Sequence, residues 1–213
     1  MMIEFFLSLA LFAQDAVPAE TADTPIAEAE AFDPQAALAG VNGWINSIET
    51  YRARFDQVAD DGSHAGGTLS IRRPGRLRFE YDDPSPLLVV ADGTTVAMED
   101  SDLETVDRVP LRSTPLWWLL KPDVDLAEDA RVTDVFVEDN RLYVDVEDRN
   151  DEMDGQARFV FNTVTYALEE WFVADSLGYV TRVTLSDVET DVRLNPRLFV
   201  LDEPEDERRN RRQ

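Results

Sequence analysis

Residues 68–81 read TLSIRRPGRLRFEY and contain two runs in which apolar and polar side chains alternate. In the second run, Leu77, Phe79 and Tyr81 fall on one face of an extended chain, and the arginines and the acid between them fall on the other. The first run ends at Pro74. The stretch therefore predicts two β-strands, each with one apolar face and one polar face.

Arg73 lies at the end of the first run. If the strand is regular, Leu69, Ile71 and Arg73 share a face, and the guanidinium points toward the apolar side. Its five donors then need acceptors, and the unpaired carbonyls at the C-terminal ends of covering helices are suitable ones. The alternative is that the strand is already ending before Pro74, so that Arg73 turns out into water. The pattern alone leaves both orientations open.

The same alternation recurs along most of the chain, with Gly, Pro, Asp and Asn between the segments. In one of them, Tyr51, Ala53 and Phe55 share the apolar face. We expect about eleven strands in all. Two are the runs above, with bounds 65–73 and 76–82. The others are 51–56, 86–92, 94–100, 103–109, 131–138, 142–146, 157–161, 166–174 and 179–187. So many strands do not suit one flat sheet. The sequence predicts a mainly β fold with a few helices, an incomplete, open antiparallel β-barrel with a hydrophobic concave side.

Two segments carry helical signals instead. Asp33-Pro34 supplies an N-cap and a first-turn proline, and the apolar residues that follow recur every three or four positions, which predicts an amphipathic helix over 34–48. In the gap from 110 to 130, Thr114-Pro115 again resembles a helix start, and a further helical turn is expected over 125–130.

The segment 116–120 (LWWLL), inside that gap, is apolar all round. A short helix tolerates this only when it is enclosed, so we expect these helices to cover the mouth of the barrel as a lid. Trp117 and Trp118 either contact a lipid or pack in the core, and the pattern does not decide. Trp171 and Phe172 fall on opposite faces of one strand, so at most one of them lines a cavity.

Composition excludes several classes of function. The formal net charge of −24 leaves no broad cationic surface, which argues against nucleic-acid binding. The absence of cysteine excludes disulfides, thiolate metal sites, a cysteine nucleophile and an N-terminal lipobox. His64, the one histidine, lies in a glycine-rich segment that predicts a hairpin turn. No P-loop, dinucleotide fingerprint or Gly-x-Ser-x-Gly elbow occurs, so we expect neither an enzyme nor a cofactor.

The run 148–155 resembles a calcium loop only superficially. Met153 stands where an EF-hand needs glycine, and no helices flank the run, so a solvated hairpin tip is the better interpretation.

The N-terminus predicts export. Residues 5–13 (FFLSLALFA) form an apolar block much shorter than the roughly 20 residues of a membrane-spanning helix, which suits the core of a signal peptide. Cleavage fits best after Ala19, although Glu4 is the only charge before the block. The alternative is an apolar N-terminus on a cytoplasmic protein. We predict a signal peptide over 1–19, an acidic disordered linker over 20–32, the folded domain over 33–201 and a mobile charged tail over 202–213.

Two blocks carry a family resemblance. The segments 72–81 (RRPGRLRFEY) and 86–93 (PLLVVADG) resemble the signature region of the periplasmic outer-membrane lipoprotein carrier family. The order of elements agrees, because this family has a helix followed by an F-x-Q strand, matched here by Phe55-Asp56-Gln57, and an internal lid helix that Thr114-Pro115-Leu116 resembles. The resemblance spans roughly 35–201.

The resemblance implies an incomplete eleven-stranded barrel, closed by helices, whose cavity carries lipoprotein acyl chains across the periplasm. It implies that Arg73 latches the lid, which favours the inward orientation, and that Leu77 faces the cavity. The residues that we predict for the acyl cavity and lid are Arg73, Leu69, Ile71, Leu77, Phe79, Phe55, Leu116, Trp117 and Leu120.

These inferences lead to the hypothesis of a monomeric periplasmic chaperone. The expected partners are lipoprotein acyl chains, a lipoprotein-releasing ABC transporter of the inner membrane and a lipoprotein acceptor at the outer membrane. Because no nucleotide site occurs, the energy for loading must come from the membrane partner. One alternative is a periplasmic module on the same half-barrel that senses lipid or protein. A lipid hydrolase is disfavoured, because His64 would be its only imidazole.

Overall fold

The structure is a computed structural model that describes residues 32–149, 156–175 and 177–200. The predicted signal peptide, the predicted linker up to residue 31 and the predicted tail lie outside the described residues, as do residues 150–155 of the candidate calcium loop.

Eleven strands form one antiparallel sheet, as the alternation predicted. Its spatial order is β6-β5-β4-β3-β2-β1-β11-β10-β9-β8-β7. Since β6 and β7 stand at the two ends of this order, the sheet is not closed into a barrel. The strands are β1 (Thr50–Val58), β2 (His64–Arg72), β3 (Arg76–Tyr81), β4 (Leu87–Asp92), β5 (Thr95–Asp100), β6 (Thr105–Pro110), β7 (Arg131–Glu138), β8 (Arg141–Glu147), β9 (Gln156–Asn162), β10 (Leu168–Ala174) and β11 (Val180–Thr190).

The topology consists of two meanders joined at the middle of the sheet. Strands β1 to β6 follow one another in space, β7 to β11 do the same, and β11 pairs with β1. Tyr51 in β1 therefore has Ile71 of β2 on one side and Thr190 of β11 on the other. The first strand of the domain becomes the central one.

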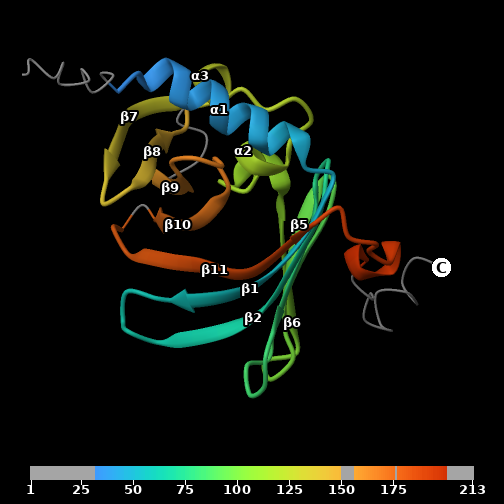
Figure 1. Cartoon of the computed structure of the whole chain (residues 1–213). Helices are drawn as coiled ribbons and strands as arrows, with labels where there is room; N and C mark the ends of the chain where they lie inside the picture. Colours follow the sequence, from blue (N-terminus) through green and yellow to red (C-terminus); the bar gives the residue numbers. More distant parts are fainter. Residues whose placement is uncertain (1–31, 150–155, 176, 201–213) are drawn as a thin grey trace, which may run out of the picture. The chain divides into compact units, whose positions relative to one another are not determined.

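The α-helices lie on one side of this curved sheet (Figure 1). Helix α1 (Pro34–Ser47) starts at the predicted residue, where the Asp33 carboxylate accepts from the backbone N–H of Gln35 at 2.9 Å. The connection from β6 to β7 carries the 3₁₀ turn η1 (Leu111–Ser113), α2 (Trp117–Leu120) and α3 (Leu126–Asp129), and a second 3₁₀ turn, η2 (Pro196–Phe199), follows β11. Residues 111–130 are called the lid segment below.

The predicted start of the lid helix is wrong in one detail. The Thr114 hydroxyl donates to the carbonyl of Leu111 at 2.8 Å, so it belongs to the end of η1. Helix α2 begins later, after Leu116, and no side chain caps it. The preceding 3₁₀ turn competes for the hydroxyl, and a local sequence pattern does not show this competition.

The core lies between the concave face of the sheet and the helices. Tyr51, Ala53 and Phe55 of β1 are buried, and the residues between them are more exposed. From the other side, α1 buries Ala37, Val41 and Ile45, and the lid segment buries Trp118, Leu120 and Leu126. The apolar concave side that the alternation predicted is therefore present, and helices cover it.

Candidate functional site

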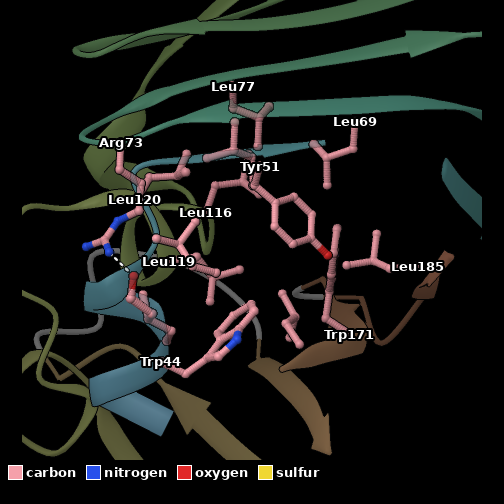
Figure 2. A pocket seen from close by; sticks show the side chains of 14 residues that line it. Trp44, Tyr51, Leu69, Arg73, Leu77, Leu116, Leu119, Leu120, Trp171 and Leu185 are labelled. Carbon is pink, nitrogen blue, oxygen red and sulfur yellow. Dashed lines mark hydrogen bonds between the residues drawn. The ribbon is translucent and has the colours of Figure 1, made fainter. Parts of the chain in front are cut away.

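An apolar pocket lies between the concave face and the helices (Figure 2). It is lined from α1 and its C-cap, from strands β1, β2, β3, β10 and β11, and from the lid segment. The lining residues are Trp44, Ile45, Ile48, Tyr51, Leu69, Ile71, Arg73, Leu77, Leu116, Leu119, Leu120, Leu168, Trp171 and Leu185.

The pocket is small as it stands. Its volume of about 40 Å³ has room for roughly three water molecules. An acyl chain of a dozen or more methylene groups, each about the size of a water molecule, does not fit in this volume. We therefore call this conformation closed, because the pocket would have to widen before it could hold such a chain.

The structure brings together most of the residues predicted for the cavity. Arg73, Leu69, Ile71, Leu77, Leu116 and Leu120 line the pocket.

Three of the predicted residues lie outside the lining. Phe55 and Phe79 are buried against each other, with ring centroids 5.0 Å apart and edge-to-face geometry. Phe79 also contacts Trp171, which does line the pocket. Trp117 is half-buried, with the Arg112 guanidinium 5.1 Å from its ring centre. The rings of Phe55 and Phe79 therefore pack beside the pocket.

Arg73 has the inward orientation of the two that the sequence left open. One Nη donates to the carbonyl of Ile45 in the last turn of α1, and Figure 2 marks this bond with a dashed line. The other Nη donates to the carbonyl of Lys121, the C-cap of α2, at 2.6 Å, and to the side-chain oxygen of Asn46 at 3.2 Å. One guanidinium thus joins the C-terminal ends of two helices.

The charge of Arg73 is well suited to this position. Burial lowers the pKa of Arg73, and the nearby carboxylate of Asp123 opposes the shift. Arginine still keeps its proton, because its ordinary pKa is so high. Carbonyls at helix C-termini carry partial negative charge, so a permanent cation is a good match for them. The Ile45 carbonyl also accepts from the N–H of Ile48 at 3.3 Å.

A second set of bonds fastens α1 to the lid segment. The Asn46 side chain accepts from the N–H of Val124 and donates to the carbonyl of the same residue, both at 2.8 Å. The Asn42 side chain accepts from the N–H of Leu126 at 3.1 Å and donates to Asp125 at 3.2 Å. The lid segment is bonded to the sheet side as well, because the N–H of Gly75, between β2 and β3, donates to the carbonyl of Leu120 at 2.8 Å.

Asn42 and Asn46 were missed by the sequence analysis, which followed the apolar positions of this helix. Their spacing of four residues, which places two amides on one helix face, is the signal that points to them.

Tyr51 has a different relation to the pocket. The residue is 2% exposed, and its hydroxyl has no hydrogen-bond partner among the described residues. Figure 2 shows the ring reaching across the pocket, with the hydroxyl oxygen toward Trp171 and Leu185. Burial raises the pKa of Tyr51, so the hydroxyl keeps its proton.

The other residues of interest have structural surroundings. Trp118 is buried in the core, and Trp171 lines the pocket while Phe172 lies under the Arg182 guanidinium on the other face. His64 begins β2, exposed, with Nε2 3.3 Å from the Asp56 carboxylate.

Within the ranges given above, no three His, Asp or Glu side chains come together as metal ligands. Among the same residues, no helix is both long enough and apolar enough to cross a bilayer.

Comparison with known proteins gives relatives along most of the chain. A protein named outer-membrane lipoprotein carrier protein from Nitrosomonas europaea is 29% identical over 178 residues, which cover 79% of this chain and 86% of that protein. A protein of the same name from Methylococcus capsulatus is 28% identical over 181 residues, 80% of this chain and 84% of that protein.

Among solved structures, a LolA superfamily protein from Nitrosomonas europaea matches with a TM-score of 0.46 and 9% identity, covering 80% of this chain and 99% of that one. The sequence model of the family described as outer membrane lipoprotein carrier protein LolA matches residues 46–202. This match includes every strand and the whole lid segment, and the chain belongs to the LolA family of outer membrane lipoprotein carrier proteins.

Proposed function

We propose that this protein carries the acyl chains of lipoproteins through the periplasm, from an inner-membrane transporter to an outer-membrane acceptor. The observation that carries the proposal is the Arg73 guanidinium, which lines an apolar pocket and bonds two helix ends that cover it. Membership of the LolA family supports the same function. Periplasmic location rests on the predicted signal peptide over residues 1–19, and we propose that the carrier acts as a monomer.

The carrier problem is one of hydrophobic burial. An acyl chain exposed to water costs about 0.8 kcal/mol per methylene, so a chain of about 15 methylenes costs roughly 12 kcal/mol. The concave face offers leucine, isoleucine and tryptophan side chains in place of water. A loaded form requires the lid segment and α1 to separate from this face, since the closed pocket has a volume of about 40 Å³.

The Arg73 bonds then set how tightly cargo is held. A hydrogen bond from a charged donor contributes about 1.5 to 3 kcal/mol, and opening breaks at least the bonds to Ile45 and Lys121. Loading therefore works against these bonds, and unloading restores them. A latch of this kind weakens cargo binding enough for transfer to a tighter acceptor.

The sequence carries no phosphate-binding motif, so the free energy for loading has to come from the transporter. The sequence also carries no recognised catalytic motif, which supports a carrier and not an enzyme.

The experiment replaces Arg73 by Leu and measures retention and transfer of a bound triacylated lipoprotein. We expect the R73L variant to retain its cargo and to transfer it at least about 10-fold more slowly, because the closed state has lost its charged bonds. The matched control is Arg72→Leu, the same change at the preceding residue, the last of β2, which is expected to behave as wild type. If the R73L variant retains and transfers its cargo as the wild-type protein does, the latch role of Arg73 is wrong.

The pocket itself has a separate test. A fluorescent acyl probe should bind the wild-type protein saturably and the R73L variant more tightly. If the wild-type protein shows no saturable binding, the carrier proposal is wrong.

A further inference from the structure

The hydroxyl of Tyr51 is a polar atom in a pocket that is otherwise almost entirely apolar. Apart from Arg73, the lining consists of aliphatic and aromatic side chains. The two Nη atoms of Arg73 already donate to two carbonyls and an amide oxygen, and its Nε has no partner among the described residues. The Tyr51 hydroxyl has no partner within the described part of the chain.

An unpartnered buried hydroxyl is costly for the closed state, because it has left water without gaining a hydrogen bond. Phenylalanine would fill the same space without that cost. Tyrosine at position 51 is therefore not explained by packing in the closed conformation.

A second tyrosine on the concave side shows that the sheet can satisfy such a group. The Tyr81 hydroxyl, in β3, donates to the side-chain oxygen of Gln57 at 2.8 Å. The Tyr51 ring is instead packed edge-to-face with Trp44, with centroids 6.4 Å apart. Figure 2 shows the ring reaching across the pocket.

The hydroxyl is also in the right protonation state to act as a donor. Burial raises the pKa of Tyr51, so the proton is present throughout the physiological range. What the site lacks is an acceptor, and the methylene groups of an acyl chain supply none. The carbonyl that joins the chain to its head group is the strong acceptor in such a ligand.

We propose that the Tyr51 hydroxyl donates a hydrogen bond to the ester carbonyl of a bound lipoprotein acyl chain. This inference rests on the carrier function proposed above and adds a polar contact that sets how deep the chain enters. The bond replaces the unsatisfied hydroxyl of the closed state, so it favours the loaded state over the empty one.

The test compares a diacylated cysteinyl lipopeptide with ester-linked chains and its analogue with ether-linked chains, which lacks the carbonyl oxygens. Affinities are measured by displacement of a fluorescent acyl probe. We expect the wild-type protein to bind the ester about five-fold more tightly than the ether. The Tyr51→Phe variant is expected to bind both with equal affinity.

The matched control is Tyr81→Phe, which removes a hydroxyl that already has a partner and should keep the ester preference. Thermal unfolding of Tyr51→Phe checks folding, and its Tm is expected to equal or exceed that of wild type.

Two outcomes overturn the inference and leave the carrier function standing. These are an ester preference that survives in Tyr51→Phe, and a wild-type protein that binds both lipopeptides equally. Failure of the wild-type protein to bind either lipopeptide would instead refute the carrier function.

Discussion

Two residues in the pocket lining have a buried polar atom without a partner in the described structure, the Nε of Arg73 and the hydroxyl of Tyr51. Both residues lie close to the center of the sheet, Arg73 just after β2 and Tyr51 in β1. Each unsatisfied group lowers the stability of the closed conformation by about 1 to 3 kcal/mol. The closed state is thus stabilised by the Nη bonds of Arg73 and destabilised by these two unpartnered atoms.

The Tyr51 pKa shift predicts how stability depends on alkaline pH. The folded chain keeps the Tyr51 proton while the unfolded chain loses it above about pH 10. The free energy of unfolding therefore falls as pH rises, by up to about 1.4 kcal/mol per pH unit for this one group. Tyr51→Phe removes that contribution, so its unfolding free energy should fall less steeply.

Urea unfolding at constant ionic strength, in steps from about pH 7 to about pH 12, measures the two slopes. Near neutral pH the unfolding free energies of the two proteins should differ by a constant amount, which serves as the internal control. Parallel curves above pH 10 would show that folding does not protect the Tyr51 proton.

At the scale of elements, α1 is the part that holds the closed state together. One face packs Val41 and Ile45 into the core, and another presents Asn42 and Asn46 to the lid segment. Its last turn also supplies the Ile45 carbonyl to Arg73. A movement of α1 would therefore break the side-chain hydrogen bonds of Asn42 and Asn46 together with the hydrogen bond that Arg73 donates to this helix. Opening would then be cooperative.

Two glycines in α1 test how closely this helix packs against its neighbours in the fold. A Cβ at Gly40 would lie 2.4 Å from ring atoms of Tyr166, whereas a Cβ at Gly43 would meet nothing within 4 Å. Gly40→Ala should destabilise the protein by about 1 to 3 kcal/mol, because the ring or the helix has to shift. Gly43→Ala should stabilise it by about 0.5 to 1 kcal/mol, since alanine is the better helix former.

Thermal and urea unfolding of the two variants give the comparison. Since both replacements make the same chemical change in one helix, effects of equal sign would contradict the close fit of α1 at Gly40.

At the scale of the whole domain, the lid segment connects the two ends of the open sheet. It leaves β6 at one end and enters β7 at the other. The sheet itself is held by continuous antiparallel pairing from β6 to β7. We therefore expect loading to move the lid segment and α1 while the centre of the sheet, at β1, β2 and β11, keeps its pairing.

Hydrogen exchange with and without a bound diacylated lipopeptide measures whether the lid segment opens while the centre of the sheet stays paired. The amides of Val124, Leu126 and Gly75 donate to Asn46, Asn42 and the Leu120 carbonyl, and loading should increase their exchange. Amides paired between β1 and β2 are the control and should not change. Equal or stronger protection of the lid amides on loading would contradict an opening lid.

Local periodicity accounts for how much could be predicted from the sequence. The alternation around Leu77 and Phe79, the Asp33 cap and the breaks at Gly and Pro led to the eleven strands and to α1, which ends one residue earlier than predicted. These features depend on neighbours in the chain, and a pattern within a few residues contains them. The family resemblance likewise came from contiguous blocks around Arg73 and residues 86–93.

Tertiary structure decided the rest, because the partners are far apart in the sequence. Arg73 reaches acceptors 28 and 48 residues away, and Asn42 bonds Leu126 across 84 positions. That Phe55 and Phe79 pack beside the pocket while Tyr51 lines it depends on how the rings fill a shared space. The sequence by itself determined which segments are strands and helices and which face of each is apolar. Only the packing of those faces decided which polar atoms find partners, because hydrogen bonds depend on distances that folding alone sets.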